Sequence, residues 1–215
     1  MKKRSTSGLL VRPTQRRDAW LFVLALEGER TGAEFKYFRA LEDGALDGSR
    51  VRLHSLPTDP AVHDSAPEKV LARLRRFLEK YEPRTDRDQY WLVLDLDTWP
   101  VEALGMVAQE AARAGYRLAI SNPCFELWLV LHETEDLGFL EGFGPPKRSG
   151  ATKRHLGELY PQGITETLAA NCWAARDRAH ALDTRPDERW PNDTGTHVYR
   201  LIDALADAGA LTRPA

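Results

Sequence analysis

The sequence predicts an α/β protein with a mainly parallel sheet, flanking helices and a C-terminal helical extension. Short continuous apolar runs, typical of strands covered on both faces, alternate with segments whose apolar residues recur at helical spacing. This alternation extends over residues 19–132. Strand–helix–strand units of this kind are right-handed and build parallel sheets. Beyond about residue 135 the pattern is helical, so we expect the rest of the chain to pack as helices.

Four strands and three helices are expected in the first part of the chain. The second strand alternates apolar and polar residues, which indicates a place near the edge of the sheet. Pro67 suits a helix start, and Gly115 is expected to end the third helix. The expected strands are 19–26, 51–56, 90–94 and 116–120, and the expected helices are 34–41, 67–81 and about 100–114.

The string SNPCFELWLVLH, residues 121–132, predicts an abrupt change from strand to helix. Asn122 is a good N-cap, and proline suits the first helical position, so we expect the helix to begin at Pro123. The helix is apolar nearly all round, which predicts burial. Glu126 then lies in the first turn, where it either complements the helix dipole or faces the carboxyl edge of the sheet.

The remainder of the chain reads as a basic loop followed by helices. GFGPPKRSG, residues 142–150, predicts a turn-rich loop, and helical segments are expected around 151–160, 164–182 and 196–208. We therefore expect a mobile basic arm over residues 1–18, an α/β core over 19–134, and a loop with helices packing on that core over 135–215.

Composition excludes some classes of protein. The chain has 215 residues with 30 basic and 32 acidic side chains, so any contact with nucleic acid must come from a local patch. The two cysteines are too few for a disulfide framework and indicate a reducing compartment, which predicts the cytoplasm. No apolar stretch approaches about 18 residues, so no membrane partner is expected.

Acidic residues follow two of the expected strands. Glu27 and Glu29 follow the first strand, and Asp95 and Asp97 end the third, while Ser121 ends the fourth. Ligands of parallel α/β sheets bind beyond the carboxyl ends of the strands. Residues two apart project to the same side, so Asp95 and Asp97 can converge. Gathered carboxylates repel one another unless a cation lies among them, and Mg²⁺ suits oxygen ligands. For each acid taken singly, a solvated turn remains the alternative.

Basic residues follow in and after the expected loop. They are Lys147, Arg148, Lys153 and Arg154. A mobile loop that closes on phosphates has this composition, and so has a solvated surface loop.

Three blocks resemble the RloB-like proteins of the wider Toprim group. They are LALEGERTGAEFKYF (24–38), YWLVLDLDTW (90–99) and AISNPCFELWLVLH (119–132), and a weaker fourth block is PNDTGTHVYRLIDAL (191–205). The resemblance implies a Toprim-like, Rossmann-like sheet. The sequence departs from the family pattern at Thr98-Trp99-Pro100, which is less polar than the family's usual stretch. This difference leaves the Asp95/Asp97 pair intact, but the family's substrate contacts at this point do not carry over.

The resemblance also implies a function. Mg²⁺, with Mn²⁺ as a substitute, would be held by Glu27, Asp95 and Asp97, with Glu126 as an additional ligand, for phosphodiester cleavage in phage defence. Glu27 would hold metal or act in proton transfer. The substrate would be nucleic acid, RNA slightly favoured over DNA, and a partner ATPase would be encoded nearby.

Two other readings stay open at this point. LVLDLDT, residues 92–98, also resembles the first motif of haloacid-dehalogenase-like phosphatases, in which Asp95 would be a covalent nucleophile. Against it, no later apolar strand ends in an acidic pair, and Glu27 would have no role. The third reading is a non-catalytic sensor or adaptor that keeps the fold and binds an ATPase or nucleic acid.

Overall fold

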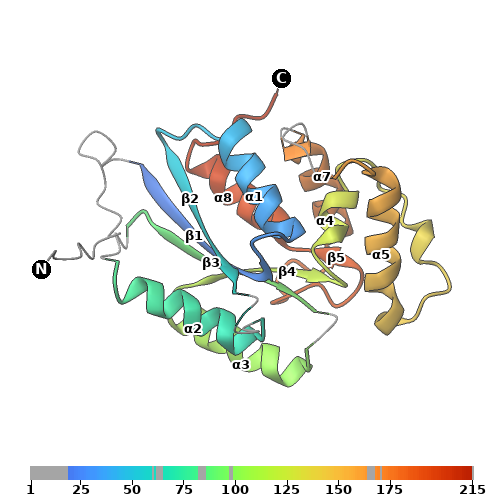
Figure 1. Cartoon of the computed structure of the whole chain (residues 1–215), viewed down its shortest axis with the longest axis horizontal. Coiled ribbons are helices and arrows are strands. Elements are labelled where there is room, and N and C mark those ends of the chain that lie inside the picture. The colour runs from blue at the N-terminus through green and yellow to red at the C-terminus, as the bar shows by residue number, and fades with distance from the viewer. Residues whose placement is uncertain are drawn as a thin grey trace, which may run out of the picture.

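The structure is a computed structural model that describes residues 19–59, 61, 65–81, 86–96, 99–163, 168–169 and 171–214. In these residues, five strands form one sheet in the order β2-β1-β3-β4-β5 (Figure 1). The first four strands are parallel, and β5 is antiparallel to β4. The strands are β1 (Trp20–Glu29), β2 (Val51–Thr58), β3 (Gln89–Asp95), β4 (Arg117–Asn122) and β5 (Gly195–Thr196).

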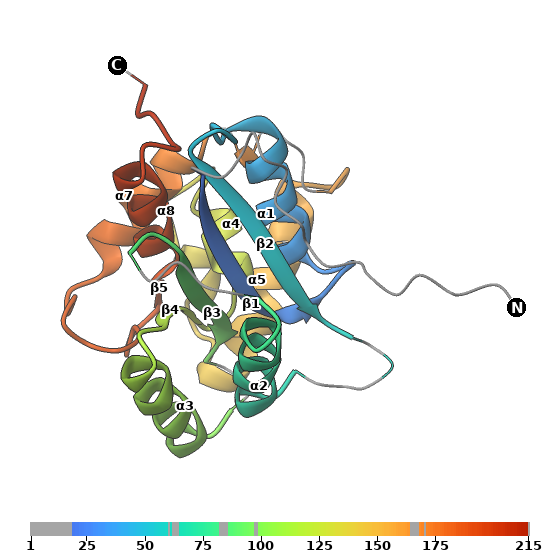
Figure 2. The ribbon, with the colours of Figure 1, turned by 90° about the vertical axis from the view of Figure 1, so that its left-hand side faces the viewer.

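Helices cover both faces of the sheet (Figures 1 and 2). One face carries α2 (Pro67–Leu78) and α3 (Val101–Arg113), whose apolar residues pack against Val23, Ala25 and Leu92. The opposite face carries a larger core that includes Phe22, Leu24 and side chains of the other helices. These are α1 (Ala33–Gly44), α4 (Glu126–Val130), α5 (Pro145–Leu159), α7 (Cys172–Leu182) and α8 (Val198–Asp207), with the short 3₁₀ helix η2 (Gly138–Leu140) before α5.

The predicted fold class is confirmed, and so are its main local signals. The first strand is buried from Phe22 to Leu26, as its apolar run predicts. The alternating strand β2 lies at the sheet edge, where its Pro57 is tolerated because an edge strand can lack one ladder donor. Gly115 follows α3 with φ +74°, a conformation that glycine adopts without strain.

The expectation of a loop at 142–150 is wrong, because α5 begins at Pro145. Gly144 is extended at the N-cap position, and prolines occupy the first turn of the helix. The missing proline N–H would have no helical acceptor there, and the fixed φ suits a helix, so Pro-Pro begins this helix instead of preventing it. The basic residues from 147 to 154 therefore lie on one helix.

The expectation that Asn122 caps a helix starting at Pro123 is also wrong. Asn122 is the last residue of β4, its peptide bond to Pro123 is cis, and α4 begins at Glu126. The Asn122 amide instead donates to the carbonyls of Pro191 and Asn192, at 3.0 and 3.2 Å. The amide is thus used by a distant segment that sequence periodicity does not reveal. The expected burial is confirmed, since Leu127–Val130 are all buried.

The C-terminal segments are helical and share the core of the sheet. Leu201, Ile202 and Leu205 of α8 are fully buried in the same cluster as Phe22. The expected helix over 164–182 is described from Cys172, and the one over 196–208 is preceded by the unexpected strand β5. The arm over residues 1–18 lies outside the described residues, and the division of the chain at 134/135 stays a prediction. None of the helices in the described segments is long and apolar enough to span a bilayer.

Candidate functional site

The strand ends bring two of the predicted acids together. In the parallel register Leu26 pairs with Val93, and Asp95 pairs with Ser121, so β1, β3 and β4 end at the same edge of the sheet. At this edge the backbone N–H of Asp95 donates to Glu27 Oε2 at 3.0 Å. The sequence separation of these residues is 68, and the sheet register alone makes them neighbours.

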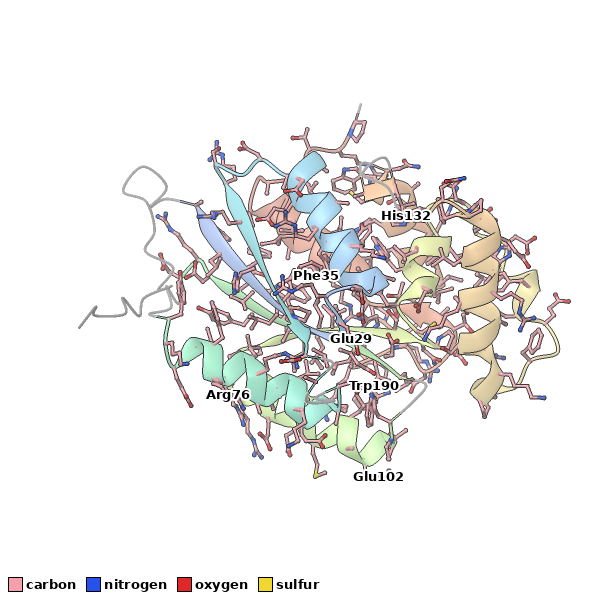
Figure 3. All side chains as sticks on the ribbon, viewed as in Figure 1. Glu29, Phe35, Arg76, Glu102, His132 and Trp190 are labelled. Carbon is pink, nitrogen blue, oxygen red and sulfur yellow. The ribbon has the colours of Figure 1, made fainter. Side chains whose placement is uncertain are left out.

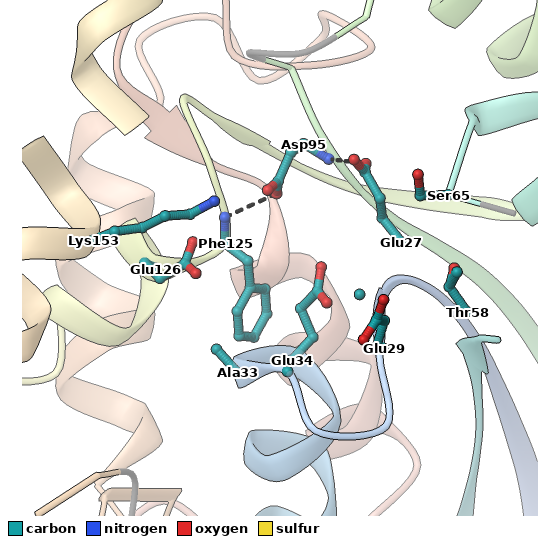
Figure 4. Close-up of a pocket in the computed structure, with 12 residues that line it drawn as sticks. Glu27, Glu29, Ala33, Glu34, Thr58, Ser65, Asp95, Phe125, Glu126 and Lys153 are labelled. Carbon is teal, nitrogen blue, oxygen red and sulfur yellow. Dashed lines mark hydrogen bonds between the residues drawn. The ribbon is translucent and has the colours of Figure 1, made fainter. Parts of the chain in front are cut away.

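A cavity of about 300 Å³ opens at this edge (Figure 4). Five carboxylates and one lysine line it, together with small and hydroxyl-bearing residues from several elements. The carboxylates come from β1, the first turn of α1, the end of β3 and the start of α4. The lining residues are Glu27, Gly28, Glu29, Gly32, Ala33, Glu34, Thr58, Ser65, Asp95, Phe125, Glu126 and Lys153.

Glu34 is the lining acid that the sequence analysis missed. It lies in the first turn of α1 and is 6% exposed. Its side chain lies against Gly28, where a Cβ atom would be 1.5 Å from Glu34 Oε2. Gly28 must therefore lack a side chain for Glu34 to reach the cavity. The available signal was an acid at the start of the helix directly after the Glu27-Gly28 strand end.

Electrostatics distinguish Glu34 from an ordinary surface acid. Burial, reinforced by the negative charges of Glu27 and Glu126, raises the pKa of Glu34 from 4.5 to about 8. The backbone N–H of Gly28 and the ammonium of Lys153 oppose this rise. The cavity thus concentrates more negative charge than its single lysine compensates, and a perturbed carboxyl in a cavity is typical of functional sites.

Hydrogen bonds orient the two strand-end acids. Glu27 Oε1 accepts the indole N–H of Trp99 at 2.9 Å, while its Oε2 accepts the N–H of Asp95. Asp95 Oδ1 accepts the backbone N–H of Phe125 at 2.8 Å (Figure 4). The corner before α4 therefore delivers a backbone amide to Asp95 and the carboxylate of Glu126 to the cavity. This is the structural role of the SNPCFE string.

The donor set of this cavity fits a hard divalent cation. All five acids offer oxygen ligands, and a cation would relieve the repulsion from Glu27 and Glu126 that adds to burial in raising the pKa of Glu34. As placed, the described side chains contain no group of three or more His, Cys, Asp or Glu that encloses one ion. Asp97, the other predicted ligand, lies outside the described residues. Glu29, by contrast, lines the cavity from the end of β1.

The predicted basic residues separate into different environments along α5. Lys153 lines the cavity. Arg148 donates to the carbonyl of Phe143 at 3.0 Å and to Thr194 Oγ1 at 3.2 Å, so it ties α5 to neighbouring segments. Lys147 and Arg154 are exposed, and neither lines the cavity as described.

Other polar groups near this edge are structural. Ser121 is fully buried, and its hydroxyl bonds Thr196 Oγ1 at 2.8 Å, which joins β4 to β5. Cys124 is also fully buried, and burial raises the pKa of its thiol far above the usual value. A thiol in this state is a poor nucleophile.

A second cavity, of about 420 Å³, lies between α3, the start of β4 and the segment 187–189. Its walls are formed by Trp91, Tyr116 and Leu118 together with three arginines, and the acids Asp187 and Glu188 also line it. None of the five carboxylates that line the first cavity lines this second one. The acid-lined cavity is therefore the candidate site for chemistry. Figure 3 shows Glu29 near that edge, whereas Arg76 and Glu102 lie on the outer surfaces of α2 and α3.

Comparison with known proteins identifies the family. No curated protein and no solved structure matches the chain. A family model described as RloB-like protein matches residues 22–205, a range that contains both Glu27 and Asp95. Since that match covers most of the 215 residues, the chain belongs to the RloB-like family.

Proposed function

We propose that the protein is a Mg²⁺-dependent nuclease of the Toprim group that cleaves phosphodiester bonds. The observation that carries the proposal is the convergence of five carboxylates and one lysine on a single cavity at the carboxyl edge of a parallel sheet. Sites in such sheets lie at this edge, and metal-dependent phosphodiester cleavage uses an oxygen-ligated cation together with a group that binds phosphate.

The residues assigned to the cation are Glu27, Glu34, Asp95, Asp97 and Glu126. When bound, Mg²⁺, or Mn²⁺ in its place, supplies Lewis-acid polarisation of the phosphate and neutralises its developing charge. The protein's own contribution is placement. Hydrogen bonds from the Asp95 and Phe125 amides hold the Glu27 and Asp95 carboxylates before any substrate arrives.

Two side chains carry the remaining roles. The Lys153 ammonium binds a non-bridging phosphate oxygen, which fixes the phosphodiester against the acidic wall. Glu34 holds a proton at neutral pH in the cation-free protein, because its pKa is about 8. A cation that takes Glu34 as a ligand must therefore displace this proton.

The substrate and setting follow from the family resemblance. We propose nucleic acid as substrate, with RNA slightly favoured over DNA, a role in phage defence, a partner ATPase and a cytoplasmic location. The near balance of 30 basic and 32 acidic residues means that binding depends on a local patch, and Lys153 is the lysine at the cavity.

The test is cleavage of labelled RNA and DNA by the full chain in Mg²⁺ or Mn²⁺, with and without the neighbouring ATPase. Asp95→Asn and Glu34→Gln are the site variants. Glu141→Gln, an acid-to-amide change at an exposed position outside the cavity lining, is the matched control. We expect each site variant to lose at least about 100-fold in rate, and the control to retain activity.

Calorimetry with Mn²⁺ gives an independent readout. Wild type and Glu141→Gln should bind the ion, and Asp95→Asn should bind it more weakly. If wild type neither binds Mn²⁺ nor cuts nucleic acid in the presence of the ATPase, the nuclease proposal is wrong. Turnover of a phosphomonoester, with a phosphoryl mimic trapped on Asp95, would support the phosphatase instead.

A further inference from the structure

Trp99 donates to Glu27 from the segment between β3 and α3. Its indole Nε1 lies 2.9 Å from Glu27 Oε1, across 72 residues of sequence. The ring is half-buried and packs against the apolar cluster on the α2/α3 face. Glu34 and Phe125 approach the cavity from α1 and α4, on the opposite face (Figure 4). Trp99 therefore donates to Glu27 from the α2/α3 side of the sheet, whereas Glu34 and Phe125 come from the other side.

The chemistry of the contact is directional. An indole N–H is a donor only, so it requires an acceptor oxygen, which Glu27 Oε1 supplies. The Trp99 indole donates to Oε1 and the Asp95 amide donates to Oε2, so the two donors act on different oxygens of Glu27. Two donors on different oxygens orient the carboxylate as a whole, and Glu27 lines the acidic cavity in that orientation.

The contact also restricts a torsion that is otherwise soft. The terminal torsion of a glutamate has a broad, roughly two-fold profile, so packing of the side chain alone does not fix the carboxylate plane. Two donors on different oxygens do fix it. An indole anchored in an apolar cluster supplies one of them with little freedom of its own.

We propose that Trp99 is a positioning residue, which holds the Glu27 carboxylate in the orientation that a divalent cation requires; this rests on the proposed function. The Trp99 indole then has a physical role at this strand end. It supplies a rigid donor to the strand-end acid, and Trp99 itself touches neither cation nor substrate.

The contact is tested first in cation-free protein. The chain has six tryptophans, and Trp99→Phe identifies the Trp99 indole resonance in a ¹H–¹⁵N spectrum by removing it. Glu27→Gln should shift that resonance upfield, since a neutral amide oxygen is a weaker acceptor than a carboxylate. Glu29→Gln, which removes another acid of the same cavity, should leave it in place.

The consequence is tested with Mn²⁺. Outer partners of metal ligands are worth 10–100-fold in affinity, so Trp99→Phe should bind Mn²⁺ roughly tenfold more weakly. It should also lower kcat more than it raises KM. Trp173→Phe is the matched control, because it also removes one indole hydrogen bond, the one to the carbonyl of Thr212, at a residue outside the cavity lining.

The outcomes separate this inference from the proposed function. A Trp99 resonance that does not move in Glu27→Gln, or a Trp99→Phe variant with unchanged Mn²⁺ affinity and kcat, overturns the positioning role while the nuclease proposal stands. If wild type binds no Mn²⁺, the proposed function fails and the positioning role fails with it, even where the spectrum still shows the contact.

Discussion

Glu34 is expected to destabilise the folded, cation-free protein at neutral pH. Its pKa is about 8 when folded and 4.5 as a free side chain, so the unfolded chain releases this proton at a lower pH than the folded chain does. The free energy of unfolding therefore falls as pH rises from 4.5 to 8. Glu34→Gln removes this titration, and thermal or urea unfolding at pH 7 in EDTA should show it to be more stable by roughly 3 kcal/mol.

The pH profile and the response to Mn²⁺ identify the cause. Below pH 4.5 the advantage of Glu34→Gln should vanish, because Glu34 is then protonated in both states. Saturating Mn²⁺ should raise the melting temperature of wild type more than that of the variant, since ligands stabilise the state that binds them. Glu141→Gln should follow wild type under both conditions. A stability difference between Glu34→Gln and wild type that does not change with pH would mean that burial and the neighbouring charges do not raise the pKa of Glu34.

At the scale of elements, the spacing of apolar residues predicted the strands and helices that depend on neighbours along the chain. It missed the elements that depend on contacts with distant residues. Strands β1, β3 and β4 followed from their apolar runs, and β2 followed from its alternation of apolar and polar residues. The two-residue strand β5 has no pattern of its own and exists because Thr196 meets Ser121. The helix expected around 151–160 is the later part of α5, and its start was missed because Pro-Pro was taken as a turn signal, although proline also suits the first turn of a helix.

The residues of the candidate site also divide into those that the sequence predicts and those that it does not. Glu27 and Asp95 were predictable because parallel strands end at a common edge, and the hydrogen bond between them follows from the register. Glu34 was not, because its place depends on how α1 returns over Gly28, a contact that no local pattern encodes. The indole of Trp99 reaches Glu27 from a segment that carries no periodic signal at all.

Helix α5 gives a prediction about its two adjacent cations. Both side chains are exposed, but Lys153 lines the acidic cavity and Arg154 does not. A hydrogen bond to a charged group contributes about 1.5–3 kcal/mol, so Lys153→Met should weaken RNA affinity at fixed salt by at least about tenfold. Arg154→Met should change it much less. Fluorescence anisotropy in an Asp95→Asn background measures both without cleavage, and equal losses would mean that Lys153 acts only through general charge.

The stability of the whole molecule in acid is expected to depend on a histidine in its larger core. His132 lies between α1 and the C-terminal helices (Figure 3), is 1% exposed, and has Nδ1 at 2.9 Å from the carbonyl of Trp128. Burial lowers its pKa from 6.5 to about 4. The unfolded chain thus binds this proton first, and stability is lost as pH falls from 6.5 to 4.

This pKa shift corresponds to a loss of roughly 3 kcal/mol in the free energy of unfolding of wild type between pH 6.5 and 4. His132→Gln should not show this loss, because glutamine does not titrate. The free energy of unfolding of wild type minus that of His132→Gln, measured in urea, should therefore fall between pH 6.5 and 4 and level off below. Taking the difference cancels the contributions of distant groups, including Glu34, whose contribution to stability changes in the opposite direction above pH 4.5.

Leu129→Ala is the control, because it truncates a neighbouring core residue and removes no titrating group. It should lower the free energy of unfolding by about 2–5 kcal/mol at every pH and leave the slope of stability against pH as in wild type. A wild-type slope equal to that of His132→Gln would mean that the core admits the charged imidazolium, and acid unfolding would then have to originate elsewhere in the molecule.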